Sequence, residues 1–146
     1  MYHDGQLSLA KLYNTHTVLE RALSERVWLK TGAYLVIQYT EALTVIDVNS
    51  GKCNAKKNPL ETYLKINLEA AREVAKQMRL RNLSGIIIVD FINLDDADAT
   101  RELLKTFRQH LSKDPIQATL VDVTELQLVE LTRKKVRRPL YESIAE

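Results

Sequence analysis

Two strongly apolar segments of this chain each end in an aspartate. The segment LTVIDVNSGK begins at Leu43 and contains Asp47, and the segment GIIIVDFINL begins at Gly85 and contains Asp90. Short runs rich in β-branched residues predict strands, and the segment 58–80 between them has the apolar spacing of a helix. A strand, a helix and a second strand indicate parallel neighbours whose carboxyl ends meet at one edge of a sheet. We therefore expect the two aspartates to converge.

The remaining elements predict an α/β fold with a mixed β-sheet, in which an N-terminal antiparallel hairpin joins parallel strands, flanked by about three helices. The run 85–91 is apolar at successive positions, so we expect a central strand covered on both faces. Short connections indicate a single domain over residues 1–146. The predicted helices are 7–23, 58–80 and 96–111, and the predicted strands are 27–29, 34–38, 43–48, 85–91, 117–123 and 126–132.

Composition narrows the possible classes of protein. The chain has 146 residues, a net charge of +2 and a single cysteine, Cys53, so it can form neither an internal disulfide nor a multi-cysteine metal site. Its longest apolar run is interrupted by Asp90, so we expect no membrane span. The start, MYHDGQ, lacks the apolar core of a signal peptide. These features predict a cytoplasmic protein.

The two aspartates have two interpretations. Side chains alternate across a strand, so Asp47 and Asn49 share one face, and Asp90 takes the corresponding position on its own strand. Two converging carboxylates suit a magnesium ion, which takes one or two protein carboxylates and completes its shell with water and substrate phosphate. Aspartate is also common where a strand enters a turn, because it bonds local backbone. The sequence pattern alone leaves both interpretations open.

Basic residues occur in two places that could contact phosphates. One pair ends the predicted helix 58–80, where cations also favour the negative end of the helix dipole. The other group begins the tail RKKVRRPLYESIAE, which is expected to be a loop or terminal extension and could equally be a solvated charged terminus. The candidate RNA-binding residues are Arg79, Arg81, Arg133, Lys134 and Lys135.

Three long segments together resemble the ribonuclease E/G family. They are VWLKTGAYLVIQYTEALTVIDVNSGK, NLEAAREVAKQMRLRNLSGIIIVDFINL and LVELTRKKVRRPL, and the resemblance runs from YHDG to RRPL. It covers the catalytic subdomain of that family, whose fold is described as similar to deoxyribonuclease I. It therefore implies that this chain is a domain excised from a longer protein. We expect that full-length parent to form a homo-oligomer.

The resemblance also implies an activity. The family's two magnesium ligands fall on Asp47 and Asp90, and the asparagine that helps place the attacking water falls on Asn49. These positions imply magnesium-dependent endonucleolytic cleavage of single-stranded RNA, which leaves a 5′-phosphate and a 3′-hydroxyl, in RNA processing and decay. The family's RNA-clamping domains have no counterpart in these residues, so we expect this fragment alone to be poorly active.

One position departs from the family pattern, and other functions compete with nuclease activity. Gln117 stands where the resemblance would place an arginine of the family's 5′-phosphate pocket, so the resemblance leaves open whether a 5′-monophosphate end is sensed. The alternative function is an RNA-binding protein of the same fold with little or no nuclease activity, and a third is a structural interaction domain. The joint presence of Asp47, Asn49 and Asp90 favours the nuclease, because binding alone does not need that trio.

Overall fold

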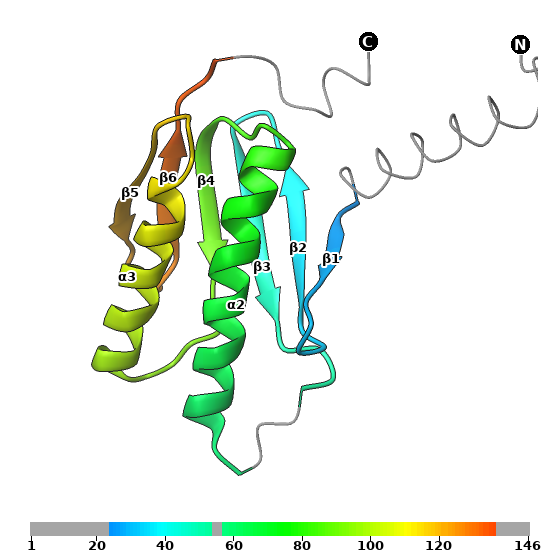
Figure 1. Cartoon of the computed structure of the whole chain (residues 1–146), viewed down its shortest axis with the longest axis vertical. Helices are drawn as coiled ribbons and strands as arrows, with labels where there is room; N and C mark the ends of the chain where they lie inside the picture. The colour runs from blue at the N-terminus through cyan, green and yellow to red at the C-terminus, as the bar shows by residue number, and fades with distance from the viewer. Residues whose placement is uncertain (1–23, 54–56, 137–146) are drawn as a thin grey trace, which may run out of the picture.

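The computed structural model describes residues 24–53 and 57–136, which form one six-stranded sheet and two helices (Figure 1). The strands are β1 (Arg26–Trp28), β2 (Tyr34–Tyr39), β3 (Leu43–Asn49), β4 (Gly85–Asp90), β5 (Ala118–Val123) and β6 (Val129–Arg133), and the helices are α2 (Pro59–Leu80) and α3 (Ala97–Ser112). The mixed α/β class is confirmed. The predicted count of about three helices is too high for the described part, and the helix expected over 7–23 lies outside it. Neither helix is long and apolar enough to cross a membrane.

The strands are arranged in the order β1-β2-β3-β4-β6-β5. The predicted hairpin of β2 and β3 is confirmed, and β3 pairs in parallel with β4 as the intervening helix indicated. The helix α3 lies between β4 and β5 in sequence, an order that also indicates parallel pairing of these two strands. That pairing is not formed, because β6 inserts between β4 and β5 and is antiparallel to both. Within the described residues, β3 and β4 are therefore the only parallel neighbours.

The helix α2 begins where its sequence predicts. The Asn58 side chain accepts a hydrogen bond from the Glu61 N–H (3.2 Å) and donates one to the Glu61 carboxylate (2.9 Å), while Pro59 occupies the first turn. The helix α3 begins in the same way, with Asp96 accepting from the Ala99 N–H at 2.8 Å. Both starts are local interactions, which explains why the sequence pattern located them.

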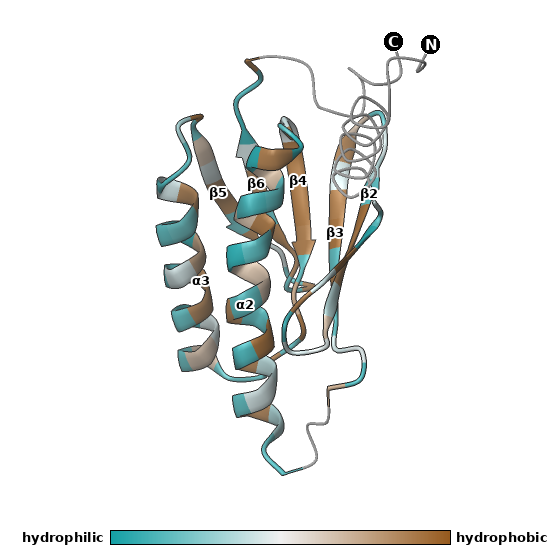
Figure 2. Ribbon diagram, turned by 45° about the vertical axis from the view of Figure 1, so that its right-hand side comes forward, coloured by the Kyte–Doolittle hydropathy of each residue, from teal (hydrophilic) through white to brown (hydrophobic). Residues whose placement is uncertain are grey.

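Both helices pack against the same face of the sheet (Figure 2). Their buried side chains meet the inward residues of the strands in a single core, which includes Val74, Phe107, Ile46, Ile87 and Leu131. Among residues 24–53 and 57–136, no helix covers the other face, which is called the open face below. Within these two ranges β4 is therefore covered by helices on one face and not on both as expected, and its residue Ile86 is 46% exposed.

A buried ion pair connects the end of β6 to the segment that follows α3. Arg133 donates from Nε and Nη2 to the Asp114 carboxylate at 2.8 and 3.2 Å, and both side chains are only 2% exposed. Its Nη1 donates to the side-chain oxygen of Asn82 and to the Leu83 carbonyl, each at 2.9 Å. Burial would raise the pKa of Asp114, but the bonds from Arg133 and from a backbone N–H hold that pKa below its ordinary value. Arg133 is thus part of the core and not the start of a loop.

The second buried cation, Arg81, joins the end of α2 to the N-terminal strands. Its Nε donates to Gln77 at 2.8 Å, and its two terminal nitrogens donate to the Tyr39 hydroxyl at 2.6 Å and to the Ser24 carbonyl at 2.5 Å. Every nitrogen of this guanidinium therefore bonds within the protein, and the residue is fully buried. Satisfied bonds of this kind are what a buried charge requires.

We predict that Arg133→Met destabilises the fold by about 3–5 kcal/mol, because it leaves the Asp114 carboxylate buried and unpaired. The matched control is Arg101→Met, which breaks the Arg101–Asp98 pair, where both side chains are largely exposed. That change should alter the free energy of unfolding by about 1 kcal/mol or less. Urea unfolding of the two variants measures the difference, and equal losses would contradict a structural role for Arg133.

Candidate active site

Asp47 and Asp90 are direct partners across the parallel pair of β3 and β4. Both lie at the carboxyl ends of their strands, and both are exposed on the open face of the sheet. The predicted convergence is therefore confirmed as a matter of geometry. Neighbouring strands lie about 4.8 Å apart, so the two carboxylates can act on one small ligand.

The chain that leaves β4 is held by two contacts on the helix side of the sheet. The buried Asn67 side chain donates to the Ile92 carbonyl (2.8 Å) and accepts from the Ile92 N–H (3.0 Å), as a neighbouring strand would. Phe91 meets Phe107 edge to face, with ring centroids 5.5 Å apart. These contacts hold the residues just after Asp90 in place, and they thereby fix the backbone at the end of β4, where Asp90 lies.

Asn49 ends β3 on the same face as Asp47 and forms the turn that follows. Its side-chain oxygen accepts a hydrogen bond from the Gly51 N–H at 2.8 Å. Gly51 has φ +60°, and an added Cβ would lie 2.4 Å from the Gly32 carbonyl oxygen, so only glycine fits there. The segment NSGK is thus a turn. Because the Asn49 oxygen is engaged, its NH2 group is the part that could meet a substrate or water.

The two acids affect each other electrostatically. Partial desolvation, followed by repulsion from Asp90, raises the pKa of Asp47 above its ordinary value, while a hydrogen bond from the Val48 N–H opposes the rise. A positive charge close to both carboxylates favours their charged forms and offsets the repulsion between them. A cation bound between them would have that effect.

The acid pair fits magnesium better than it fits a closed protein metal site. The described residues contain no cluster of three or more histidine, cysteine, aspartate or glutamate side chains able to hold a metal. Two exposed carboxylates on an open face leave room for water and substrate phosphate, which a magnesium site normally needs. The two carboxylates do not make a typical zinc site, because zinc sites in proteins usually have three or four protein ligands, which often include nitrogen or sulfur.

The carboxyl ends of α2 and β6, where the predicted basic residues lie, are at the opposite end of the sheet from the carboxyl ends of β3 and β4 (Figure 1). Arg79 ends the helix that leads into β4, and Lys134 and Lys135 follow Arg133, the partner of Gly85 at the start of β4. The length of β4 separates this end from Asp90 by roughly 17 Å.

Three of these five residues remain available for RNA. Arg79, Lys134 and Lys135 are exposed, whereas Arg81 and Arg133 are buried with their bonds satisfied. A phosphate could reach those two guanidinium groups only by breaking the bonds that hold them. We therefore withdraw Arg81 and Arg133 as RNA contacts.

A group of residues that the sequence analysis overlooked borders the acids on the open face. Arg26 and Trp28 of β1 alternate with Val27, which packs against the core, and Trp28 pairs with Tyr34 of β2. The Trp28 and Tyr34 ring centroids are 4.9 Å apart. The alternation in RVW could have shown that arginine and tryptophan share a face, but their distance from the acids depends on the strand order.

We predict that Asp47 titrates above the ordinary aspartate range of about 3.9, and that Asp90→Asn moves its pKa down only partly, because desolvation is the larger cause. A raised folded pKa means that the folded state binds more protons, so stability attributable to Asp47 falls as pH rises from the ordinary value through the raised one. Carboxyl-carbon NMR titrations of both proteins measure this. A full return to the ordinary value in Asp90→Asn would show that repulsion alone causes the shift.

Comparison of the sequence with known proteins places this chain in a family. The sequence model of the ribonuclease E/G family matches residues 1–136. The chain is 44% identical over 140 residues to a Ribonuclease E of Synechocystis sp., which covers 96% of this chain and 21% of that protein. It is 40% identical over 136 residues to a Ribonuclease G of Salmonella typhimurium, covering 93% and 28%.

A Ribonuclease G of Escherichia coli strain K12 is 39% identical over 139 residues, which cover 95% of this chain and 28% of that protein. The chain thus spans between 21% and 28% of the length of these three relatives. The match extends over both strands that carry Asp47 and Asp90 and over the helix between them. The chain belongs to the ribonuclease E/G family.

Proposed function

We propose that this chain is the catalytic subdomain of a magnesium-dependent endoribonuclease that cleaves single-stranded RNA to 5′-phosphate and 3′-hydroxyl ends, in RNA processing and decay. The observation that carries the proposal is the direct pairing of Asp47 with Asp90 at the carboxyl ends of two parallel strands. The family membership and the names of the relatives, Ribonuclease E and Ribonuclease G, support the substrate class.

In this proposal each residue of the site has its own role. Asp47 and Asp90 would hold a magnesium ion, which supplies charge neutralisation at the scissile phosphate and lowers the pKa of bound water. The Asn49 NH2 group would donate a hydrogen bond that orients the attacking water, because its oxygen is engaged by Gly51. Arg79, Lys134 and Lys135 would contact phosphates of the same RNA away from the cleavage point. Positioning of the strand is left largely to other parts of a longer protein, so cleavage by this chain alone should be slow.

The competing function, an RNA-binding protein without nuclease activity, is favoured by one observation. The exposed cations lie at the far end of the sheet from the acids, so RNA could bind there without approaching Asp47 or Asp90. The two functions differ in how they depend on magnesium. The nuclease requires magnesium bound by Asp47 and Asp90, whereas RNA binding at the far end of the sheet does not.

We predict that Asp47→Asn stabilises the metal-free chain and weakens its response to magnesium. Unit charges about 5 Å apart repel by roughly 3 kcal/mol at an effective dielectric of 20, and solvent at the open face reduces this to the order of 1 kcal/mol. The wild-type chain should gain about 1.4 kcal/mol at a magnesium concentration ten times the dissociation constant. Thermal melts across a magnesium series, at constant ionic strength, measure both effects.

The matched control is Asp122→Asn, because Asp122 is also an exposed strand aspartate, and its carboxylate also accepts a bond from the next N–H, that of Val123 (2.8 Å). It should leave the magnesium response unchanged. An equal loss in Asp47→Asn and Asp122→Asn, or a metal-free Asp47→Asn that is less stable than wild type, would make Asp47 a structural residue. Cleavage of a labelled single-stranded RNA with magnesium, which Asp90→Asn should abolish, then separates the nuclease from the RNA-binding alternative.

A further inference from the structure

Arg26, Trp28 and Tyr34 form a compact group on the open face, called the aromatic cluster below. The Arg26 guanidinium carbon lies 4.3 Å from the centroid of the Tyr34 ring and 5.7 Å from that of Trp28. The two rings are tilted by 51° with centroids 4.9 Å apart. One planar cation and two aromatic rings are therefore held together on a short stretch of two paired strands.

The position of the cluster relative to the acids follows from the register. Tyr34 pairs with Asn49 across β2 and β3, and Arg26 pairs with Val36, which in turn pairs with Asp47. Directly opposed residues have Cβ atoms about 5 Å apart, so Tyr34 is a lateral neighbour of Asn49. The cluster and the acid pair thus occupy adjoining columns of the same open face.

Packing among residues 24–53 and 57–136 does not account for the Trp28 side chain. Trp28 is 57% exposed, and the residue of β1 that packs against the core is Val27. An arginine on this edge strand could serve to discourage pairing with another chain, but a large exposed ring has no such purpose. An exposed indole beside an arginine can instead stack an unpaired nucleobase, as aromatic side chains do in proteins that bind single strands.

We propose that the aromatic cluster is a subsite that stacks an unpaired base of the RNA next to the cleaved linkage, and this rests on the function proposed above. Trp28 provides the surface for the base, and Arg26 offers a planar cation for stacking or for the adjacent phosphate. Base stacking tolerates any sequence but requires an exposed base face, so the subsite selects single strands over duplexes. The chemical class of its ligand is thus an unpaired nucleotide within an RNA strand.

The test uses Trp28 itself, because it is the only tryptophan in the chain. The chain is titrated without magnesium with a short, unstructured, dye-labelled oligoribonucleotide, and tryptophan emission and dye anisotropy are recorded on matched samples. We expect the tryptophan emission to be quenched as RNA is added, and we expect the quenching to saturate at the same RNA concentration as the rise in dye anisotropy. We expect Trp28→Leu to weaken binding by roughly 5- to 100-fold and Trp28→Phe, which keeps a ring, to weaken it much less.

Two further comparisons separate stacking from charge. Arg26→Gln should reduce the slope of log affinity against log salt by about 1, whereas Trp28→Leu should lower affinity without changing that slope. Arg108→Gln is the matched charge control, because Arg108 is exposed on α3, on the opposite side of the sheet. An abasic oligonucleotide of equal length should bind wild type and Trp28→Leu equally.

The subsite is overturned if the chain binds no RNA, or if tryptophan emission does not change at saturating RNA. It is also overturned if the abasic oligonucleotide binds as tightly as RNA, or if a folded Trp28→Leu variant binds RNA with unchanged affinity. Circular dichroism establishes that Trp28→Leu is folded, and Trp28→Phe provides the same comparison if it is not. Magnesium-dependent cleavage without quenching would refute only the subsite. Because cleavage by this chain alone should be slow, only quenching with no magnesium-dependent cleavage on prolonged incubation, and with the same quenching in Asp90→Asn, would refute the nuclease and leave the subsite as an RNA-binding surface.

Discussion

The parallel pairing of β3 with β4 is the constraint on which the candidate site depends. Parallel neighbours need a crossover, and α2 supplies it, so that both strands point the same way and end at the same edge. The register then sets Asp47 opposite Asp90. A slip of one residue would turn one acid toward the helix-covered face, where an unpaired carboxylate could not be accommodated without a large cost. The core on that face therefore enforces the alignment of the acids on the other.

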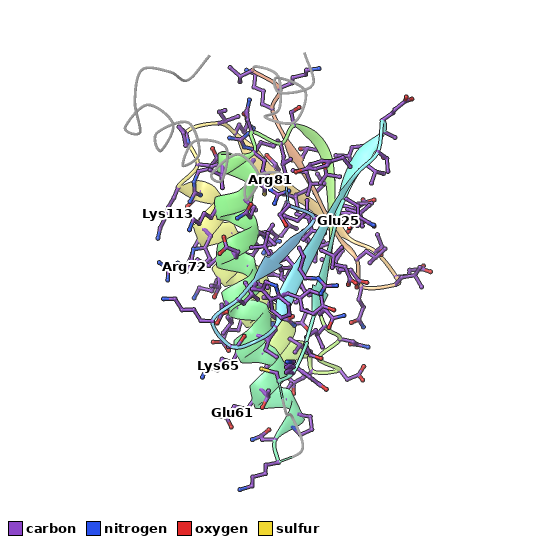
Figure 3. The ribbon with its side chains drawn as sticks, turned by 90° about the vertical axis from the view of Figure 1, so that its right-hand side faces the viewer. Glu25, Glu61, Lys65, Arg72, Arg81 and Lys113 are labelled. Carbon is purple, nitrogen blue, oxygen red and sulfur yellow. The ribbon has the colours of Figure 1, made fainter. Side chains whose placement is uncertain are left out.

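In the part of the chain that the structure describes, the helices cover only one face of the sheet, and the proposed function depends on this as well. The helices bury one set of side chains, and Figure 3 shows Arg72 of α2 and Lys113, which follows α3, on the outer side of the helix layer. The open face carries the acids, Asn49 and the aromatic cluster. Because these groups face solvent, the repulsion between Asp47 and Asp90 is tolerable in the absence of a cation. The same exposure allows an extended RNA strand to lie across several columns of the sheet.

The buried arginines show how similar residue types can have opposite roles. Arg79 and Arg81 are two positions apart at the end of α2, yet Arg79 is exposed and Arg81 bonds to Gln77, Tyr39 and Ser24. A helix turns by about 100° per residue, so two positions move a side chain to a different side. Arg133 and its neighbour Lys134 differ in the same way at the end of β6. A run of basic residues is therefore not by itself an RNA-binding surface.

The sequence by itself determined the features that arise from neighbours along the chain. Asn58 and Asp96 start the helices, the β2–β3 hairpin follows from two short apolar runs, and strand alternation places Asp47 with Asn49. These follow from local hydrogen bonds and from the two-residue period of a strand. The convergence of Asp47 with Asp90 was also predictable, because a strand–helix–strand order favours parallel neighbours.

Only the tertiary structure decided the remainder. The insertion of β6 between β4 and β5, the solvent exposure of one sheet face and the burial of Arg81 and Arg133 depend on contacts between residues far apart in sequence. The approach of Trp28 and Tyr34 to Asn49 depends on strand order in the same way. Periodicity states which residues share a face, but it does not state what covers that face or which strand lies beside it, because packing free energy is set by the whole assembled core.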